Sequence, residues 1–399
     1  MDVRRIQGVI KEYDWGNTSF LPELLGLKKD GRSKAEYWMG THPSGDATVL
    51  PEGEPLSSFL RSHAETYLGS AHLARYGATL PLLFKVLAIE KPLSIQCHPT
   101  TEQAEAGWKK ETSLRFRDKD SSHWDYKDAT RKAEVAFALT PMTAMCGFRP
   151  YEEIVASLEL LMPSSFARCF QLSSDGTQGI RQIFQTLYTM DKETLSLCIK
   201  EYLASLVKHE EMPLSSADGR FLESKGIVMA CKDAYPSDPG LFSPFLLHVL
   251  HLEEGEALYL KPDTLHAYVL GDCIELMSAS DNVLRGGLTH KKVDVPELLS
   301  LMSTEGGAME KCREVREPDG RIRVMTPTPE FALYEMRTGS YRIHHDKVEL
   351  LLSLDGDAVL EKDGEKVTLE KGACVLKGAS VSDYRLDVNG LLFSATLGD

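Results

Sequence analysis

The stretch that decides the fold is PLSIQCHPTTEQA, residues 92–104, which places a glutamine and a histidine two positions apart just before a proline. Side chains alternate between the two faces of an extended chain, so Gln96 and His98 point one way with Ser94, and the apolar residues between them point the other. A solvent-facing strand edge gives the same alternation. Gln96 and His98 are therefore candidate metal ligands only if other parts of the chain supply partners.

The segment around it, LPLLFKVLAIEKPLSIQC (residues 80–97), is rich in Leu, Ile and Val but is interrupted by Lys85, Glu90 and Lys91. These charges exclude a membrane span, which needs about 20 predominantly apolar residues in a row. The segment predicts two strands joined at Glu90-Lys91-Pro92. The second strand has a polar row backed by an apolar row.

The bulk properties limit the classes of partner. At 399 residues the chain is long enough for two or three domains, and its 42% hydrophobic and 26% charged residues are ordinary for a soluble globular protein. The formal net charge of −14 disfavours nucleic acid and anionic membrane surfaces, because both require basic patches. We therefore expect a small-molecule ligand, no nucleic acid and no membrane partner.

Eight cysteines are scattered along the chain without a CxxC pair, which favours reduced thiols over disulfides or a cysteine zinc site. The start, MDVRRIQGVIKEYDWG, lacks the apolar segment of a signal peptide. The sequence therefore predicts a cytoplasmic protein.

The chain is predicted to contain four segments. Residues 1–150 carry short β-rich runs, and over 151–240 apolar residues recur at the three- and four-residue spacing of amphipathic helices. Strand character returns over 241–320, where LEEGE (252–256) between two β-rich runs predicts a hairpin. Residues 321–399 hold short strands with regularly spaced turns, which predicts a small β-sandwich or barrel. We expect a mainly β fold with a helical insertion and a C-terminal β domain.

A second candidate element of the site is RKAEVAFAL, residues 131–139. As a strand it would place Lys132 and Glu134 on one face together with two alanines, which leave space as a pocket wall does. A Lys–Glu ion pair on a sheet surface would give the same pattern. Both interpretations stay open from this element alone.

The third element runs from residue 258 to 292, and its His266 follows a strand and a proline turn, which resembles the second metal-binding motif of cupin barrels. Glu275 lies between apolar neighbours, where partial burial would raise its pKa and suit it to proton transfer. Arg285 and Lys291 flank a Gly-Gly pair, which lets the chain turn closely enough for cations to converge on an anion such as phosphate. A solvated basic loop is the alternative.

The three elements together supply four nitrogen or oxygen donors suited to a borderline divalent ion such as zinc: Gln96, His98, Glu134 and His266. No thiolate is among them. This donor set argues against a structural zinc site and favours one with an open position for substrate.

These residues lie in stretches that resemble the type I phosphomannose isomerases (mannose-6-phosphate isomerases). The similar stretches include YDWGNTSFLPELLG, AEYWMGTHPSG, PLLFKVLAIEKPLSIQCHP, ALTPMTAMCGFRP and HAYVLGDCIELMSASDNVLRGGLTHKKVDVPELL. The combination of Q-x-H-P with SDNVxRxGLTxK is highly specific. The resemblance implies a cupin (jelly-roll) catalytic domain, a helical domain and a C-terminal cupin-like β domain.

The resemblance also implies roles for individual residues. The family's ligands for one Zn²⁺ per chain fall on Gln96, His98, Glu134 and His266. Its other site positions fall on Arg285, Glu275 and Lys132 as catalytic residues and on Ser94 and Lys291 as substrate-binding residues. The implied reaction interconverts D-mannose 6-phosphate and D-fructose 6-phosphate by proton transfer between C1 and C2 through a cis-enediol(ate). The implied setting is cytoplasmic mannose metabolism or GDP-mannose biosynthesis, with a monomer or a dimer as the assembly.

Three positions depart from the family pattern. Arg131 stands where the family usually has a pocket histidine, and His290 stands where it has a proline. The proline before the histidine ligand is shifted by one position, to Pro262. All four ligand positions are intact, so we expect any consequence in sugar affinity or preference and not in metal chemistry.

Two other functions fit parts of the pattern. A cupin oxygenase would hold iron in place of zinc, but its Lys and Arg residues would then have no purpose. A non-catalytic sugar-phosphate sensor would keep the cations and lose the acid/base residues, whereas Lys132 and Glu275 are both present. Elsewhere, the sequence predicts a turn position for His42 and packing roles for Trp15 and Trp38.

Overall fold

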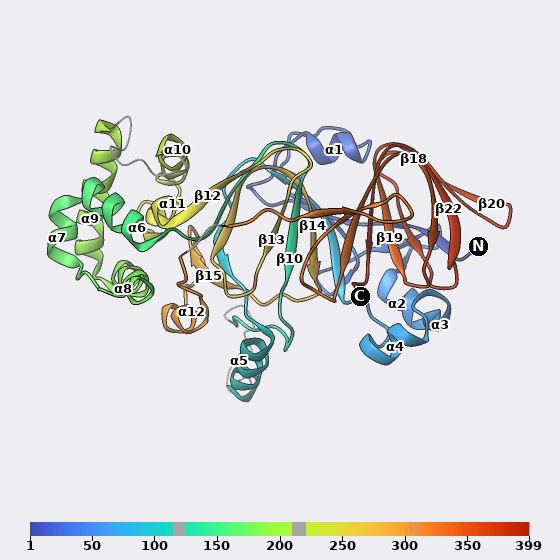
Figure 1. Ribbon diagram of the computed structural model, residues 1–399, viewed down its shortest axis with the longest axis horizontal. Coiled ribbons are helices and arrows are strands. Elements are labelled where there is room, and N and C mark those ends of the chain that lie inside the picture. The colour runs from blue at the N-terminus through green and yellow to red at the C-terminus, as the bar shows by residue number, and fades with distance from the viewer. Residues whose placement is uncertain (115–123, 210–220, 307–308, 399) are drawn as a thin grey trace.

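The computed structural model describes residues 1–114, 124–209, 221–306 and 309–398, and it divides into three parts along its longest axis (Figure 1). A helical part lies at one end, a β part containing the predicted ligands lies in the middle, and a second β part lies at the other end. The prediction of a mainly β molecule with a helical insertion is confirmed. Within the described ranges, no helix is long and apolar enough to cross a membrane.

The central β part is an antiparallel sheet built around one long strand, β14. Its strands are β2 (Val9–Lys11), β3 (Glu36–Met39), β8 (Leu82–Ile89), β9 (Ile95–Cys97), β10 (Glu134–Ala138), β11 (Met142–Phe148), β12 (Leu247–Leu252), β13 (Ala257–Leu260), β14 (His266–Ser278) and β15 (Leu284–Gly287). The first part of β14 pairs with β9 and β11, and its second part pairs with β8 and β10. One strand therefore brings β8, β9 and β10 to the same place.

β14 changes partners at Gly271, which has a φ of 112°. A Cβ at this position would lie 2.7 Å from the carbonyl oxygen of Pro141 and 2.8 Å from Cα of Met142. A bend of this kind in a strand interior needs glycine, because other residues rarely adopt this φ and the neighbouring backbone leaves no room.

The LEEGE turn joins β12 to β13, but these two strands do not pair with each other. β12 pairs with β11, and β13 pairs with β10. The predicted hairpin is therefore wrong: the turn carries the chain from one side of the central β part to the other. Turn residues fix where the chain reverses but not which strand accepts its hydrogen bonds.

The helical part confirms the helices predicted between 151 and 240. It contains α6 (Tyr151–Leu161), α7 (Pro163–Cys169), α8 (Gly176–Thr189), α9 (Lys192–Lys208), α10 (Phe221–Cys231), the 3₁₀ turn η2 (Pro239–Phe242) and α11 (Ser243–Leu246). Asp175 and Asp191 cap the starts of α8 and α9 by accepting backbone N–H groups. The core of this part includes Ile95 and Cys97, so the apolar face of β9 packs against the helices.

The remaining helices are short, apart from α5. They are α1 (Phe20–Leu24), α2 (Leu56–Ser62), α3 (Ala64–Tyr67), α4 (Ser70–Tyr76), α5 (Thr101–Leu114) and α12 (Val295–Leu301). In Figure 1, α5 and α12 project from one side of the central β part, and α2, α3 and α4 lie beside the second β part. α5 follows the Q-x-H-P stretch in sequence.

The second β part draws strands from both ends of the chain. Its members are β1 (Val3–Gln7), β6 (Thr48–Leu50), β7 (Glu54–Pro55), β16 (Glu314–Arg316), β17 (Ile322–Val324), β18 (Ala332–His344), β19 (Glu349–Lys362), β20 (Glu365–Leu369), β21 (Cys374–Lys377) and β22 (Asp383–Thr396). β4 (Thr41–His42) and β5 (Gly45–Asp46) form a separate pair. The predicted boundaries at residues 150, 240 and 320 stay predictions. The sheet of the second β part combines strands from different predicted segments: β1 of the first segment pairs with β21 of the last, and β16 of the third pairs with β17 of the last.

The two β parts share one hydrophobic core. Phe137 on β10 and Phe393 on β22 meet edge to face, with ring centroids 5.0 Å apart. This core runs without a break from Phe84 and Ile274 in the central part to Leu350 and Leu352 in the second. The site strands therefore rest on a rigid, close-packed base.

Candidate active site

Three of the four predicted metal ligands converge in the central β part. One donor atom each from His98, Glu134 and His266 lies within 4.8 Å of the others, and all three side chains are buried. Glu134 Oε2 lies 3.4 Å from His98 Nε2 and 3.5 Å from His266 Nε2. Gln96 pairs with His266 across β9 and β14, and both residues line the same cavity. The structure thus brings all four predicted ligands together.

Backbone carbonyls fix the orientation of both imidazoles. His98 Nδ1 lies 2.8 Å from the carbonyl oxygen of Asn282, and His266 Nδ1 lies 2.9 Å from that of Thr264. A carbonyl only accepts, so each Nδ1 carries the hydrogen and each Nε2 keeps its lone pair for the cluster. This is the usual arrangement around metal-binding histidines. With one carboxylate, the two imidazoles fit a divalent ion such as zinc.

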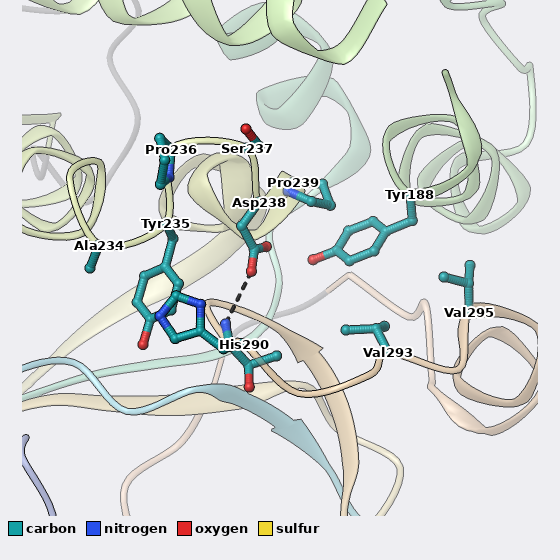
Figure 2. Close-up of a pocket in the computed structure, with 11 residues that line it drawn as sticks. Tyr188, Ala234, Tyr235, Pro236, Ser237, Asp238, Pro239, His290, Val293 and Val295 are labelled. Carbon is teal, nitrogen blue, oxygen red and sulfur yellow. Dashed lines mark hydrogen bonds between the residues drawn. The ribbon is translucent and has the colours of Figure 1, made fainter. Parts of the chain in front are cut away.

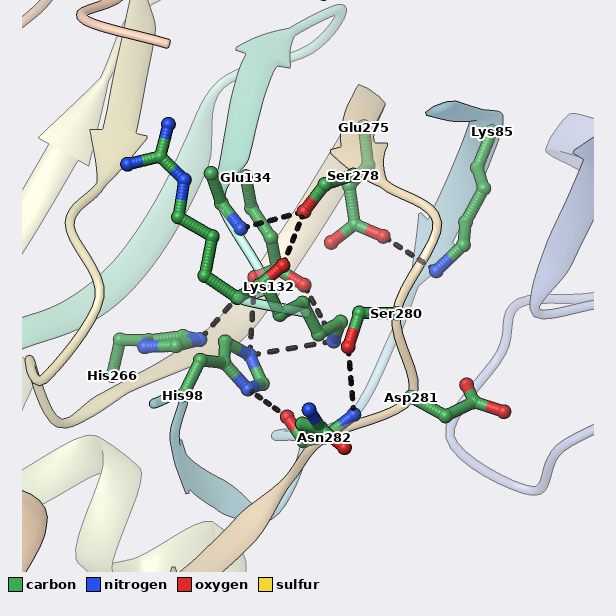
Figure 3. Close-up of polar contacts among 12 residues, drawn as sticks. Lys85, His98, Lys132, Glu134, His266, Glu275, Ser278, Ser280, Asp281 and Asn282 are labelled. Carbon is green, nitrogen blue, oxygen red and sulfur yellow. Dashed lines mark hydrogen bonds and ion pairs between the residues drawn. The ribbon is translucent and has the colours of Figure 1, made fainter. Parts of the chain in front are cut away.

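The electrostatics of the cluster favour the protonation states that a metal needs. Burial lowers the pKa of His98 to about 4, and the charge of Lys132 acts in the same direction. Burial alone would raise the pKa of Glu134, but the charge of Lys132 opposes it, and the pKa lies well below its usual range. Lys132 Nζ lies 2.6 Å from Glu134 Oε1 and 3.3 Å from His98 Nε2, as Figure 3 shows. The histidine is therefore neutral and the carboxylate charged at neutral pH.

Glu275 lies on the same cavity and pairs with a lysine that sequence reasoning missed. Lys85 Nζ lies 2.7 Å from Glu275 Oε2 and 3.7 Å from Glu36 Oε2, and all three side chains are buried. Burial raises the pKa of Glu275, Lys85 lowers it, and Glu134 raises it again, so that the net direction is upward as predicted. One ammonium serves two carboxylates, which leaves Glu275 incompletely neutralised.

Lys85 is hidden in the sequence because every residue of its strand, β8, is buried. The only sign is a single charge inside the apolar run LLFKVLAI. Trp38 packs in the core with Leu83 and Met277, as predicted, and it also lines the cavity under Lys85, with Nζ 5.0 Å from the ring centroid. His42 ends β4 and places Nε2 3.1 Å from Asp281 Oδ2 at the cavity wall.

Asn282 is a further residue that the sequence did not single out. Its amide holds the segment before Lys132: Oδ1 accepts from the N–H of Lys127, and Nδ2 donates to the carbonyl oxygen of Thr130, 2.6 Å and 2.8 Å away. Its own carbonyl accepts from His98. Asn282 thereby links the segment that carries Lys132 to a predicted metal ligand.

A second cavity, of about 610 Å³, adjoins the first and holds the predicted anion-binding residues. Gln96 lines both cavities, and Ser94, Arg285 and Lys291 line the second. Arg285 Nη1 donates to Ser94 Oγ at 2.8 Å. The charge of Arg285, then burial and Lys127, lower the pKa of Lys291. A cation whose pKa is lowered by a neighbouring cation gains stability when an anion binds beside it.

Arg131, which replaces the family's pocket histidine, does not face this space. Its Nε and Nη2 lie 2.9 Å and 2.8 Å from the two carboxylate oxygens of Glu330, so it forms a bidentate pair with the second β part. His290, which replaces the proline, lies on the loop after β15 beside Tyr235, with ring centroids 5.0 Å apart. Pro262 precedes the tight turn at Asp263, whose φ is 66°.

The fold and the site define a metal-binding protein of the cupin type, in which buried acid/base groups and a cluster of cations share a cavity with the ligands. A sequence model described as "Phosphomannose isomerase type I, catalytic domain" matches residues 3–151. The mannose-6-phosphate isomerase of Salmonella typhimurium is 32% identical over 397 residues, which cover 98% of both chains. The human enzyme of the same name is 31% identical over 406 residues, which cover 94% of this chain and 92% of the relative.

Solved structures agree with these relatives. A mannose 6-phosphate isomerase bound with zinc and yttrium superposes with a TM-score of 0.89 at 31% identity, covering 100% of both chains. A variant of phosphomannose isomerase from Salmonella typhimurium gives a TM-score of 0.88 at 30% identity with the same coverage. The chain belongs to the type I phosphomannose isomerase family, and the predicted cupin fold is confirmed.

Proposed function

We propose that this protein is a zinc-dependent aldose–ketose isomerase that interconverts D-mannose 6-phosphate and D-fructose 6-phosphate. The observation that carries the proposal is the convergence of His98, Glu134 and His266 beside a cavity that Glu134, His266 and Glu275 line. The names of the relatives and the zinc in a solved neighbour support it. Gln96 would complete the ligand set for one Zn²⁺ per chain.

The reaction moves a proton between C1 and C2 of the open-chain sugar through a cis-enediol. Its obstacles are a weakly acidic C–H bond and an oxygen that gains negative charge. Bound zinc supplies Lewis-acid polarisation of the sugar oxygens, worth several kcal/mol. The chain's own residues must do the rest: they bind the sugar, hold its phosphate and move the proton.

Glu275 is the proposed base that takes the proton from one carbon and returns it to the other. Its pKa is raised by burial, partly offset by Lys85, which brings its basicity nearer to what proton transfer at neutral pH requires. A well-placed group of this kind contributes roughly 10² to 10⁴ in rate. Lys85 holds the carboxylate in place through the 2.7 Å contact.

Lys132 and Arg285 are proposed to act on the sugar oxygens. Lys132 carries its ammonium between Glu134 and His98, where it would assist ring opening or deliver a proton. Arg285 would stabilise the negative charge that develops on oxygen. A preorganised cation at such a position costs no reorganisation during the reaction.

Ser94 and Lys291 are proposed to hold the phosphate. Both line the second cavity with Arg285, and the hydrogen bond from Arg285 to Ser94 sets the hydroxyl beside the cation. Gln96, which lines both cavities, marks where the sugar would pass from the phosphate end to the metal end.

The test is fructose 6-phosphate formation from mannose 6-phosphate, measured before chelation, after chelation and after zinc is restored. We expect activity that is lost and regained with zinc, and none with glucose 6-phosphate in the same assay. Turnover that survives complete metal removal would contradict the zinc dependence. Bound iron with oxygen consumption would favour an oxygenase, and phosphate binding without isomerisation would favour a sensor.

A further inference from the structure

The loop between the two proposed cationic residues is held from outside the central β part. Residues 286–290 connect Arg285 to Lys291. Asp238, at the end of the helical part, receives the backbone N–H of Thr289 on Oδ2 at 3.0 Å and that of Gly240 on Oδ1 at 2.7 Å. One carboxylate therefore bridges the helical part and the loop.

Tyr188 on α8 makes a second bridge to the same loop. Its hydroxyl donates to the carbonyl oxygen of Gly286. The ring is stacked on Phe184, one turn earlier on α8, with centroids 4.1 Å apart and an angle of 13°. Figure 2 shows Tyr188 and Asp238 pointing from the helical part toward the loop that carries His290.

The backbones of the loop and the helical part touch directly at two glycines. A Cβ on Gly240 would lie 2.6 Å from the amide nitrogen of Leu288, and one on Gly287 would lie 2.8 Å from Cα of Gly240. Leu288 itself adopts a φ of 49°, a left-handed conformation that is costly for a residue with a side chain. Such a conformation persists only where surrounding contacts enforce it.

The outer side of the loop gives it little support. It borders a cavity of about 420 Å³ lined by Tyr188, Tyr235, Asp238 and His290, among others (Figure 2). His290 and Lys291 are exposed. Residues 286–288 are buried and Leu288 packs in the core of the helical part, so the hydrogen bonds that Asp238 accepts and Tyr188 donates act together with that packing to hold the loop.

We propose that Asp238 and Tyr188 of the helical part are positioning residues that hold the 286–290 loop so that Arg285 and Lys291 converge on the phosphate of the substrate. The proposal rests on the function proposed above and gives the helical insertion a part in it. Neither residue touches the metal cluster, so the expected consequence is on phosphate binding and not on metal binding.

The test compares Asp238→Asn and Tyr188→Phe with Asp191→Asn. An asparagine offers one acceptor in place of two, and phenylalanine removes only the hydroxyl. Asp191 is a matched control, since its carboxylate accepts the N–H of Thr194 in the same helical part but does not contact the loop. KM and kcat for mannose 6-phosphate, zinc content, and inhibition by inorganic phosphate are measured for each variant.

In Asp238→Asn we expect KM and the inhibition constant of inorganic phosphate to rise together by about tenfold, as suits a lost hydrogen bond to a charged group. In Tyr188→Phe the rise should be smaller. kcat and zinc content should stay near wild type, and Asp191→Asn should leave all four quantities unchanged. A purely structural role would instead lower the amount of active, zinc-loaded protein without changing KM.

Unchanged KM in both variants would overturn the proposal, as would an equal rise in Asp191→Asn. If Asp238→Asn does not fold, Tyr188→Phe decides alone. Calorimetric titration of the same proteins with inorganic phosphate separates this proposal from the proposed function. A wild-type protein that binds phosphate but does not isomerise the sugar would contradict the proposed function. The positioning role would then be tested by the phosphate affinities of the same variants.

Discussion

The two β parts each bury a cluster of charged side chains, and the clusters are built differently. In the central part, His98, Glu134, Lys132, Glu275 and Lys85 border a cavity or lie against residues that do. In the second part, Glu349 on β19 is surrounded by side chains that turn inward toward it: Arg321, Tyr384, His345, Lys377 and Ser394. Among the described residues, none of these six lines the cavities reported above.

The two clusters differ in where the lone pairs and charges of their side chains point. Both carboxylate oxygens of Glu349 accept from hydroxyl groups, those of Ser394 and Tyr384. In the central cluster, two Nε2 atoms and a carboxylate converge while backbone carbonyls occupy the other side of each ring. Burial of charge alone therefore does not mark a functional site. A functional site is marked by donor atoms that converge on one point beside a cavity.

The largest effect should come from His266→Ala. Removing one of the converging donors should abolish stoichiometric zinc binding and lower kcat/KM by about 10⁴-fold or more, since the Lewis acid is worth several kcal/mol and each 1.4 kcal/mol is tenfold. Zinc content of the purified protein and the isomerase assay check this. His251→Ala is the control, because that ring is half-buried away from the cluster and pairs with Glu253. A His266→Ala protein that still binds zinc and isomerises would show that converging donors do not distinguish the central cluster from the second one.

Glu275→Gln should follow. We expect kcat to fall by roughly 10² to 10⁴ with zinc content unchanged, because the proposed proton-transfer group is lost while the proposed ligands remain. Glu335→Gln serves as the control, since Glu335 is also buried and paired, with Arg337 Nη2 at 2.6 Å. Turnover near wild type in Glu275→Gln would exclude Glu275 as the base.

Glu349→Gln should act on stability alone. Loss of one partner from a buried ionic cluster should lower the free energy of unfolding by about 3 kcal/mol. kcat, KM and zinc content should not change, because Glu349 lies outside the central part. Denaturant unfolding together with the isomerase assay measures both. A large change in KM without a change in stability would show that the second cluster is linked to the site.

The contribution of Glu349 to the free energy of unfolding should also depend on pH. Burial raises the pKa of Glu349, but His345, Lys377 and Arg321 outweigh it and hold the pKa well below the ordinary value of 4.5. The unfolded carboxyl binds its proton first as pH falls, so the stabilisation is complete above about pH 4.5 and is lost below it. The difference in unfolding free energy between wild type and Glu349→Gln should therefore narrow in acid. A difference that stays constant down to the acid transition would contradict this assignment.

Arg131→Ala should have the smallest effect. The bidentate pair with Glu330 joins the two β parts and is partly exposed, with side-chain exposures of 24% and 17%. We expect a loss of about 1 kcal/mol in unfolding free energy and no change in the preference for mannose 6-phosphate over glucose 6-phosphate. A double-mutant cycle with Glu330→Ala isolates the pair. A changed sugar preference would contradict this prediction and would show that Arg131 influences the substrate pocket.

The sequence was sufficient to predict which donor residues would meet, but it was not sufficient to predict the residues around them. Gln96, His98 and Glu134 could be singled out because they lie in or next to short runs with readable alternation, and His266 because it follows a strand and a proline turn. The family motifs also cover all four. Their convergence depends on the pairing of β14 with β9 and β10, which no local pattern specifies. Strand pairing joins residues far apart in the chain, so it needs either a structure or a known relative.

Lys85 and the LEEGE turn show two different reasons for failure. β8 is buried on both faces, so it has no period of two and its one lysine looks like an interruption. The LEEGE prediction placed the reversal correctly but chose the wrong partner, because β13 finds β10. The inward orientation of Lys85 and the placement of β13 are both decided by tertiary contacts.

The pairing of β1 with β21 has a consequence for the order in which the molecule is made. Val3–Gln7 leaves the ribosome long before its partner Cys374–Lys377, because the two strands lie far apart in the sequence. Contacts this distant in sequence form slowly because a long loop must close. One edge of the first strand can pair early with β6, but the edge that pairs with β21 must wait, and a chain without β21 would leave that edge open to other molecules. The second β part therefore closes only after β21 has been synthesised.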